Sequence, residues 1–303
     1  MYDLIIIGGG IAAITSAIYA ARKRINFLMI TKNIGEQFFS SAEIVNYPGI
    51  IKVSGVEMRE ILKKQLEFNG VFPNEGEEVK KIKKEEDGTF TVFTDKQEYK
   101  TKTIIIAVGA KPKKLNVPNE EKFIGKGITY CATCDGPLFY GMDVAVIGSG
   151  NSALEAADYM SKISPNVYLL AREKELRGHE YLQEKVKKNR KVKISYNSDV
   201  KEIFGENFVS GLRYEQNGKE KVLNVKGVII EIGREPNTEF LKGFLELEED
   251  GHIVIDCQTR TSIEGIFAAG DCASGHEYQY IIAAGQGCMA ALKAAKFLAE
   301  RKN

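Results

Sequence analysis

The sequence predicts an α/β protein with two Rossmann-like three-layer domains, each carrying a small β-meander. First, residues 3–31 follow the order strand, glycine turn, helix, strand, which is a βαβ unit. Second, the same order returns over 143–173, at an offset of 140 residues. Third, two apolar strands that end in glycine, 104–110 and 228–238, each follow a hairpin signal, AspGly or AsnGly. The chain therefore carries two copies of one type of α/β unit.

The first of these units opens the chain. Residues 4–7 are a short apolar run bounded by glycine, which is typical of a strand buried on both faces. The alanine-rich stretch 11–22 has the length of a helix, and 25–31 is again an apolar strand. The uncharged run 4–21 is long enough to cross a membrane, but three glycines interrupt it and the residues before it are not basic. We therefore expect a soluble, cytoplasmic protein with no membrane segment.

The C-terminal stretch completes the first unit and does not repeat the second. Residues 261–299 predict a strand, a GlyAsp loop and an alanine-rich helix. We therefore predict a discontinuous first domain, residues 1–112 and 243–303, with the second domain, residues 113–242, inserted between its two parts.

Composition narrows the class of protein. The 303 residues are 44% apolar and 27% charged, which is ordinary globular usage and enough for about two domains. A net charge of +1 gives no reason to expect nucleic acid or an acidic membrane as a partner. Five cysteines, an odd number with a single C-x-x-C, predict a reducing compartment with one special pair.

The first glycine turn, GGGIAA, has the spacing of a dinucleotide-binding turn. Gly8 allows the tight turn, Gly10 lets the backbone approach a pyrophosphate, and Ala13 lets the helix pack closely on the strand. The acid expected about 20 residues further on is missing, because Thr31 and Lys32 end the second strand. The alternative is a tight turn that binds no ligand.

The second turn, GSGNSA, repeats this pattern. Its candidate nucleotide-binding residues are Gly148, Gly150, Ala153, Arg172 and Arg177. A 2′-phosphate calls for clustered arginines and a 2′-hydroxyl for a carboxylate, and here the two arginines flank a glutamate, so the signal is mixed. A unit that is kept only as a scaffold remains the alternative.

The cysteine pair Cys131 and Cys134 stands directly before the second unit. Zinc would need two more ligands, but no second C-x-x-C or H-x-H exists, so we predict no metal. A static disulfide is unexpected in a reducing compartment. A redox-active pair is favoured, because one sulfur can attack while the other resolves the mixed disulfide, and Asp135 then stands next to the pair as a proton donor.

Gly270 and Asp271 follow the predicted strand GIFAA. An aspartate at this end of a strand can bind the polyol chain of a cofactor, since α/β folds place ligands at the carboxyl ends of their strands. A helix N-cap is the alternative role for Asp271.

Taken together, these motifs resemble the low-molecular-weight flavoprotein thioredoxin reductases, over the whole chain. The matching stretches are GGGIAA (8–13), EQFFSSAEIVNYPG (36–49), AVGA (107–110), YCATCDG (130–136), GSGNSALEAA (148–157), GREPNT (233–238), GIFAAGD (265–271) and GQGCMAA (285–291). The position of the C-x-x-C is specific, since the larger glutathione reductase type carries its pair in the first domain.

The resemblance implies a homodimer with FAD in the first domain and thioredoxin as the substrate. It places Gly8, Gly10 and Ala13 at the pyrophosphate of FAD. It also assigns further FAD contacts to Gln37, Asn46, Gly270, Asp271 and Gln279. Cys134 would then face the flavin and Cys131 would exchange with thioredoxin, with Asp135 as the acid. In this family a domain rotation gives the flavin and the protein substrate alternating access to the pair.

The electron donor is where this sequence departs from the family. NADPH-dependent members carry an arginine cluster at the second nucleotide site, but here Ala171, Arg172 and Glu173 stand there, and only Arg177 matches. Tyr278 replaces the arginine of an Arg-Gln pair beside the flavin. A similar group of relatives takes electrons from reduced ferredoxin, so ferredoxin is slightly favoured over NADH or NADPH. Lysines at 111–114 and 185–188 could meet an acidic ferredoxin, although a solvated charged face is their ordinary role.

Two other functions remain open. A flavoprotein of the ferredoxin–NADP reductase kind would have a similar fold, but those relatives lack the C-x-x-C. A non-catalytic flavin or nucleotide-binding module is the third alternative.

Overall fold

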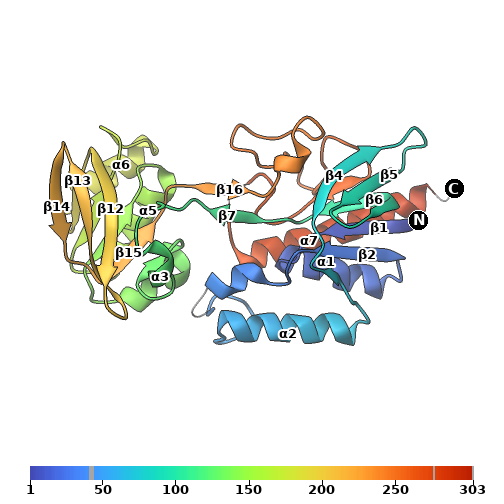
Figure 1. Cartoon of the computed structure of the whole chain (residues 1–303), viewed down its shortest axis with the longest axis horizontal. Helices are drawn as coiled ribbons and strands as arrows, with labels where there is room; N and C mark the ends of the chain where they lie inside the picture. The colour runs from blue at the N-terminus through green and yellow to red at the C-terminus, as the bar shows by residue number, and fades with distance from the viewer. Residues whose placement is uncertain (41–43, 276, 302–303) are drawn as a thin grey trace. The chain divides into compact units, whose positions relative to one another are not determined.

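The computed structural model describes residues 1–40, 44–275 and 277–301, which form two compact units (Figure 1). Unit 1 comprises Met1–Phe39, Tyr47–Lys111 and Glu235–Asn303, and unit 2 comprises Ser40–Asn46 and Pro112–Arg234. Each unit contains a mainly parallel sheet with helices and a small antiparallel meander, so the α/β class with two Rossmann-like units is confirmed.

The return to unit 1 comes earlier in the chain than the expected boundary at 242/243. The units divide between Arg234 and Glu235. The reason lies in the core of unit 1, where the side chain of Leu241 is fully buried beside Ile5 and Ile253.

The sheet of unit 1 has the order β3-β2-β1-β6-β5-β4. Strand β17 also pairs with β6, at residues 104–106, whereas β5 pairs with residues 98–101. Its strands are β1 (Tyr2–Ile7), β2 (Phe27–Thr31), β3 (Asn74–Glu75), β4 (Val79–Lys84), β5 (Phe90–Thr94), β6 (Glu98–Ile106) and β17 (Ile266–Ala268). The strands β3, β2, β1, β6 and β17 are parallel, while β4 and β5 form the antiparallel meander around the predicted AspGly turn. The meander therefore extends the main sheet of this unit.

The helices of unit 1 are α1 (Ile11–Arg22), α2 (Gly55–Phe68) and α7 (Tyr280–Glu300), with 3-10 turns at Glu36–Ser40 and Glu239–Leu241. Ser54 and Glu57 form a capping box that begins α2. Helix α7 is long and apolar enough for a membrane span, but it packs closely on α1. A Cβ on Gly287 would overlap the backbone of Ala12, and Ser16 Oγ donates to the Gly287 carbonyl at 2.9 Å. This close fit is that of a core helix.

The sheet of unit 2 is parallel, with the order β11-β10-β9-β15-β8. Its strands are β8 (Ile128–Thr129), β9 (Val144–Ile147), β10 (Val167–Leu170), β11 (Val192–Ser195) and β15 (Gly227–Ile230). A separate antiparallel meander consists of β12 (Ser198–Gly205), β13 (Val209–Gln216) and β14 (Lys219–Leu223). Positive φ angles at Asn217 and Gly218 make its two-residue turn, as the AsnGly signal predicts.

The helices of unit 2 are α3 (Glu120–Phe123), α4 (Ala132–Asp135), α5 (Asn151–Ile163) and α6 (Glu180–Lys188), with a 3-10 turn at Gly136–Phe139. Two short strands, β7 (Ala110–Pro112) and β16 (Arg234–Pro236), pair with each other where the chain passes between the units. The buried core of unit 2 lies on both faces of its parallel sheet.

Candidate functional site

The first glycine turn joins β1 to α1 and is shaped by the absence of side chains. Gly8 has φ +135°, and a Cβ there would overlap the carbonyl group of Ala107 at the end of β6. Gly10 precedes α1 and has open space where its Cβ would be. The first turn of α1 has no side-chain cap and no acidic residue. Its backbone N–H groups and helix dipole therefore suit the pyrophosphate of a dinucleotide such as FAD.

The other FAD-contact candidates of unit 1 come from segments far apart in sequence. Gln37 Nε2 donates to Asp271 Oδ2 at 3.1 Å, so the structure brings these two predicted residues together. The Gly270 N–H donates to Gln286 Oε1 on α7 at 2.7 Å, and a Cβ on Gly270 would lie 3.0 Å from Ala12 Cβ on α1. The carboxyl end of β17 thus meets the beginning of α1, where α/β folds bind their ligands.

Gln279 and Asn46 are the two remaining candidates of this set. Gln279 precedes α7 and is followed by Tyr280, whose ring packs on Phe38 with a centroid distance of 4.9 Å. Asn46 is exposed and belongs to the short segment Ser40–Asn46 that groups with unit 2. Residues 41–43 of the motif EQFFSSAEIVNYPG lie outside the described residues.

The cysteine pair of unit 2 is a closed disulfide between Cys131 and Cys134. The single-turn helix α4 begins directly after Cys131, and the Cys134 N–H donates to Cys131 Sγ at 3.2 Å. The Cys131 N–H donates to Thr129 Oγ1 at 3.1 Å. An N–H aimed at Cys131 Sγ would stabilise a thiolate on that sulfur once the disulfide is open.

Asp135 ends α4 and is half-buried. The Thr129 hydroxyl donates to Asp135 Oδ2. The other carboxyl oxygen, Oδ1, is buried and has no hydrogen-bond partner among the described residues. Burial raises the pKa of this carboxyl above its ordinary value, although the bond from Thr129 opposes the shift. A buried carboxyl with an unused oxygen next to a disulfide suits proton transfer to and from sulfur.

Glu231 is a residue of this site that the sequence analysis did not single out. It follows β15, and its Oε1 accepts a hydrogen bond from the Ala132 N–H, between the two cysteines, at 3.4 Å. Burial raises the pKa of Glu231 to about 7. Its signal was present in the sequence, because a charged residue interrupts the otherwise apolar strand VIIEIG.

The second glycine turn repeats the geometry of the first. Gly148 has φ +141°, and a Cβ there would overlap the Glu231 carbonyl group, just as one on Gly8 would overlap that of Ala107. Gly150 precedes α5 with open space at its Cβ position, and Ala153 is buried in the first turn of that helix. The turn itself could therefore receive a pyrophosphate.

The surroundings of this second turn carry a carboxylate, that of Glu173. Ser149 Oγ donates to Glu173 Oε2 at 2.7 Å, and Arg177 forms an ion pair with the same carboxylate at 3.5 Å. Arg172 is exposed and lies 3.9 Å from Asp199. Ala171, at the end of β10, is fully buried and offers no polar group. Arg172 and Arg177 thus each lie near a carboxylate, which offsets the positive charge that binding of a 2′-phosphate requires.

The two lysine clusters are largely neutralised by neighbouring carboxylates. In the first, Lys111 pairs with Glu235 at 3.6 Å and Lys114 with Glu121 at 2.7 Å. In the second, on α6, the ion pairs are Lys185–Asp158 at 2.9 Å and Lys188–Glu184 at 2.7 Å. Neither cluster is a strong basic patch.

One group of unit 1 has metal-ligating side chains close together, namely Glu248, Asp250 and His252. His252 is buried, its Nδ1 lies 2.7 Å from Asp250 Oδ1, and its Nε2 lies 3.0 Å from the Tyr278 hydroxyl. Both ring nitrogens are thus engaged. The tyrosine that replaces the family's arginine therefore has a structural partner within its own unit.

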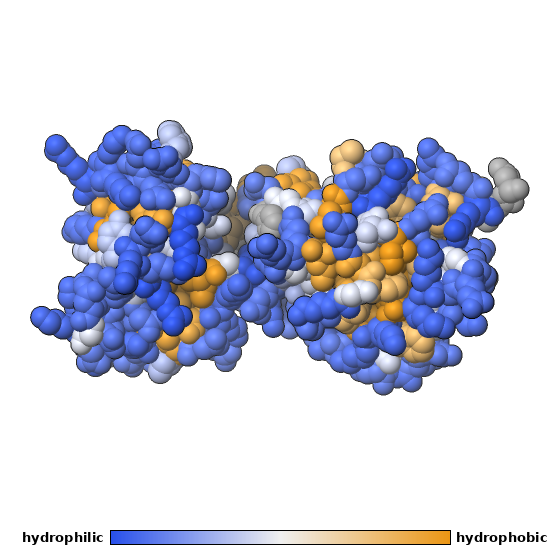
Figure 2. Space-filling view, turned by 90° about the horizontal axis from the view of Figure 1, so that it is seen from above, coloured by the Kyte–Doolittle hydropathy of each residue, from blue (hydrophilic) through white to orange (hydrophobic). Residues whose placement is uncertain are grey.

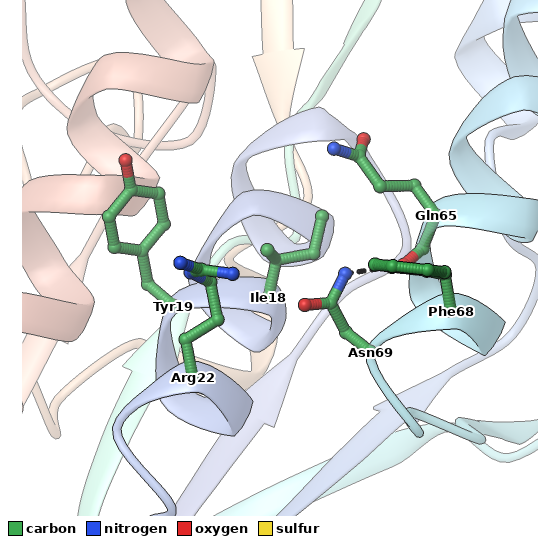
Figure 3. A pocket seen from close by; sticks show the side chains of 6 residues that line it. All are labelled: Ile18, Tyr19, Arg22, Gln65, Phe68 and Asn69. Carbon is green, nitrogen blue, oxygen red and sulfur yellow. Dashed lines mark hydrogen bonds between the residues drawn. The ribbon is translucent and has the colours of Figure 1, made fainter.

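A surface hollow of about 310 Å³ lies between α1 and α2, away from these sites. Figure 3 shows the side chains that line it, Ile18, Tyr19, Arg22, Gln65, Phe68 and Asn69. Its α1 residues lie at the C-terminal end of that helix, opposite to the glycine turn. It is therefore separate from the dinucleotide site.

Comparisons with known proteins agree with these features. The family model of the pyridine nucleotide-disulphide oxidoreductases matches residues 2–295. The chain is 39% identical over 299 residues to the alkyl hydroperoxide reductase F protein of Staphylococcus aureus, covering 98% of this chain and 59% of that relative. The chain thus spans less than two thirds of that relative's length.

Solved structures match nearly the whole chain. Thioredoxin reductase of Streptococcus pyogenes has a TM-score of 0.92 and 36% identity, with 99% of each chain covered. A ferredoxin-flavin thioredoxin reductase of Clostridium acetobutylicum has a TM-score of 0.55 and 30% identity, covering 99% of this chain and 98% of that one.

Proposed function

Because the chain belongs to the pyridine nucleotide-disulphide oxidoreductase family, we propose that it is a flavoprotein reductase of thioredoxin-type disulfides. It is an FAD-binding flavoprotein and a disulfide oxidoreductase, as its family and the thioredoxin reductase neighbours are. The observation that carries the proposal is the closed disulfide Cys131–Cys134 with the buried carboxyl of Asp135 next to it.

FAD fits the residues of unit 1. Gly8, Gly10 and Ala13 would hold its pyrophosphate, because the turn leaves open space at the uncapped end of α1. Gln37 and Asp271, already hydrogen-bonded to each other, would hold its ring and polyol parts. Gly270 and Gln279, also in unit 1, complete the unit 1 set that the resemblance implies, whereas Asn46, the remaining candidate, belongs to the segment that groups with unit 2. When bound and reduced by its donor, the flavin would supply the two electrons that open the disulfide.

The chain's own residues then carry the exchange. Opening the Cys131–Cys134 bond takes up two electrons and two protons, and Asp135 can pass a proton to the nearer sulfur. The Cys131 thiolate, stabilised by the Cys134 N–H, attacks the disulfide of thioredoxin. Cys134 then displaces the reduced thioredoxin and closes the original disulfide, so sulfur and electrons balance.

We propose reduced ferredoxin as the electron donor. Glu173 places a carboxylate against the second glycine turn, and it would repel the 2′-phosphate of NADPH. A ferredoxin-flavin thioredoxin reductase among the structural neighbours supports this choice. NADH is the second candidate, because a carboxylate beside this turn is also the acceptor that a 2′-hydroxyl needs.

The donor is tested by mixing the oxidised holoenzyme without oxygen with reduced ferredoxin, NADH or NADPH. The flavin absorbance near its visible maximum should bleach rapidly with ferredoxin and much more slowly with NADPH, because the Glu173 carboxylate would repel the 2′-phosphate. Rapid bleaching by NADPH alone would contradict the proposal. Bleaching by NADH that is lost in Glu173→Ala would establish the second candidate instead.

We also propose a cytoplasmic homodimer. Large apolar side chains are exposed on the helices of unit 1, namely Val56, Ile61 and Phe68 on α2, and Ile281, Ile282, Met289 and Leu292 on α7. Figure 2 looks onto the side of unit 1 away from α2, and hydrophobic residues gather over part of that face as well. Exposed large apolar side chains on these helices support an interface with a second copy of the chain.

Sedimentation velocity should therefore give about twice the chain mass of 33.7 kDa. Phe68 on α2 is 88% exposed, so a lysine there would place a charge in the proposed interface. Phe68→Lys should therefore shift the protein toward the monomer. The matched control is Phe208→Lys in unit 2, also at an exposed phenylalanine, which should remain dimeric. A monomeric wild type would refute the proposal.

A further inference from the structure

The parallel sheet of unit 2 brings a carboxyl group to the backbone between the two cysteines. Glu231 stands at the carboxyl end of β15, and its backbone N–H donates to Ile147 at the end of β9. Its carbonyl group packs against Gly148, where no side chain could fit. The backbone of Glu231 is therefore held from two sides, and its side chain is directed to the Ala132 N–H at 3.4 Å.

Resting on the proposed disulfide exchange, we propose that Glu231 is a positioning residue for Cys131–Cys134 that takes up a proton when this disulfide is reduced. The S–S bond breaks as two electrons enter from a reduced flavin or from a dithiol, which is oxidised in turn. One proton goes to one sulfur, the other sulfur becomes a thiolate, and the second proton goes to the carboxylate of Glu231. Charge and atoms balance without another reactant.

The charges around Glu231 set the pH at which this occurs. Burial is the main reason why its pKa is raised to about 7, and the Glu155 carboxylate on α5 raises it further. The Ala132 N–H and the charge of Arg234 oppose the shift. Asp135, on the same short helix as Ala132, is engaged by Thr129.

The sign of the effect follows from linkage between the two groups. Below pH 7 Glu231 holds its proton in both redox states, so it adds nothing to the pH dependence of reduction. Above pH 7 it is ionised while the disulfide is closed, and a new thiolate nearby raises its pKa and draws a proton to it. Reduction then takes up one proton more than it would without this carboxyl.

The experiment poises the holoenzyme in dithiothreitol buffers from pH 6 to 8.5, quenches with acid, and counts alkylated Cys131 and Cys134 by mass spectrometry. The reduction constant of Glu231→Gln, plotted against pH, should match that of wild type below about pH 6.5. Above pH 7 the wild-type reduction constant should fall about tenfold more per pH unit than that of the variant, or about 30 mV per unit for two electrons.

Two variants make the result specific. Glu231→Asp keeps a carboxyl group and should restore the extra proton, whereas Glu121→Gln removes an exposed carboxylate that is paired with Lys114 and should match wild type throughout. If the reduction constant of Glu231→Gln differed from that of wild type by the same factor at every pH, the contact would be purely structural and the proposal would be overturned. Identical pH curves of the reduction constant for wild type and Glu231→Gln would also overturn the proposal. If both of these proteins still reduced thioredoxin, the proposed function would stand even then.

Discussion

Replacing Cys134 with serine should abolish thioredoxin reduction while leaving reduction of the flavin by its donor intact. The variant cannot form the Cys131–Cys134 disulfide, so no dithiol is regenerated and the mixed disulfide on Cys131 is not resolved. The rate of thioredoxin reduction should fall by about three orders of magnitude, as expected when one member of a catalytic unit is lost. Stopped-flow flavin absorbance and an insulin-coupled thioredoxin assay measure the two steps separately.

The control for this experiment is Cys257→Ser. Cys257 is exposed and forms no disulfide, so its loss should leave both steps unchanged. Thioredoxin reduction that persists in Cys134→Ser would show that another route carries the electrons, and the proposed exchange would then be wrong.

Replacing Gly8 with alanine should abolish FAD binding and destabilise the fold. An alanine at φ +135° is strained, and its Cβ would overlap the Ala107 carbonyl group, so the backbone of β1 or β6 must move. We expect a loss of about 2–5 kcal/mol in the free energy of unfolding of the apoprotein, measured by urea denaturation. Flavin content after purification should fall to background.

Gly10→Ala separates the two effects of this change. Gly10 has φ −79°, and its Cβ would enter open space, so the apoprotein should lie within about 0.5 kcal/mol of wild type. That open space is where the pyrophosphate would lie, so FAD affinity should still fall. Unchanged flavin content in Gly10→Ala would place the dinucleotide elsewhere.

Much of the architecture follows from local patterns in the sequence. The two glycine turns, the apolar strands before them and the AspGly and AsnGly hairpins each depend on residues close together in the chain. The domain boundary at Arg234 does not follow from a local pattern. It depends on the burial of Leu241 in a core with residues more than 200 positions away in the chain.

The candidate site shows the same division. The C-x-x-C and Asp135 are local motifs, so the sequence alone determined which cysteines pair in a disulfide and the class of α/β fold. Only the tertiary structure brought Glu231 to Ala132, Glu173 to Ser149, and Tyr278 to His252. These pairs are separated by 99, 24 and 26 residues. Their contacts and charges arise where distant strand ends meet at one edge of a sheet, or where distant loops pack together, and no local pattern records that meeting.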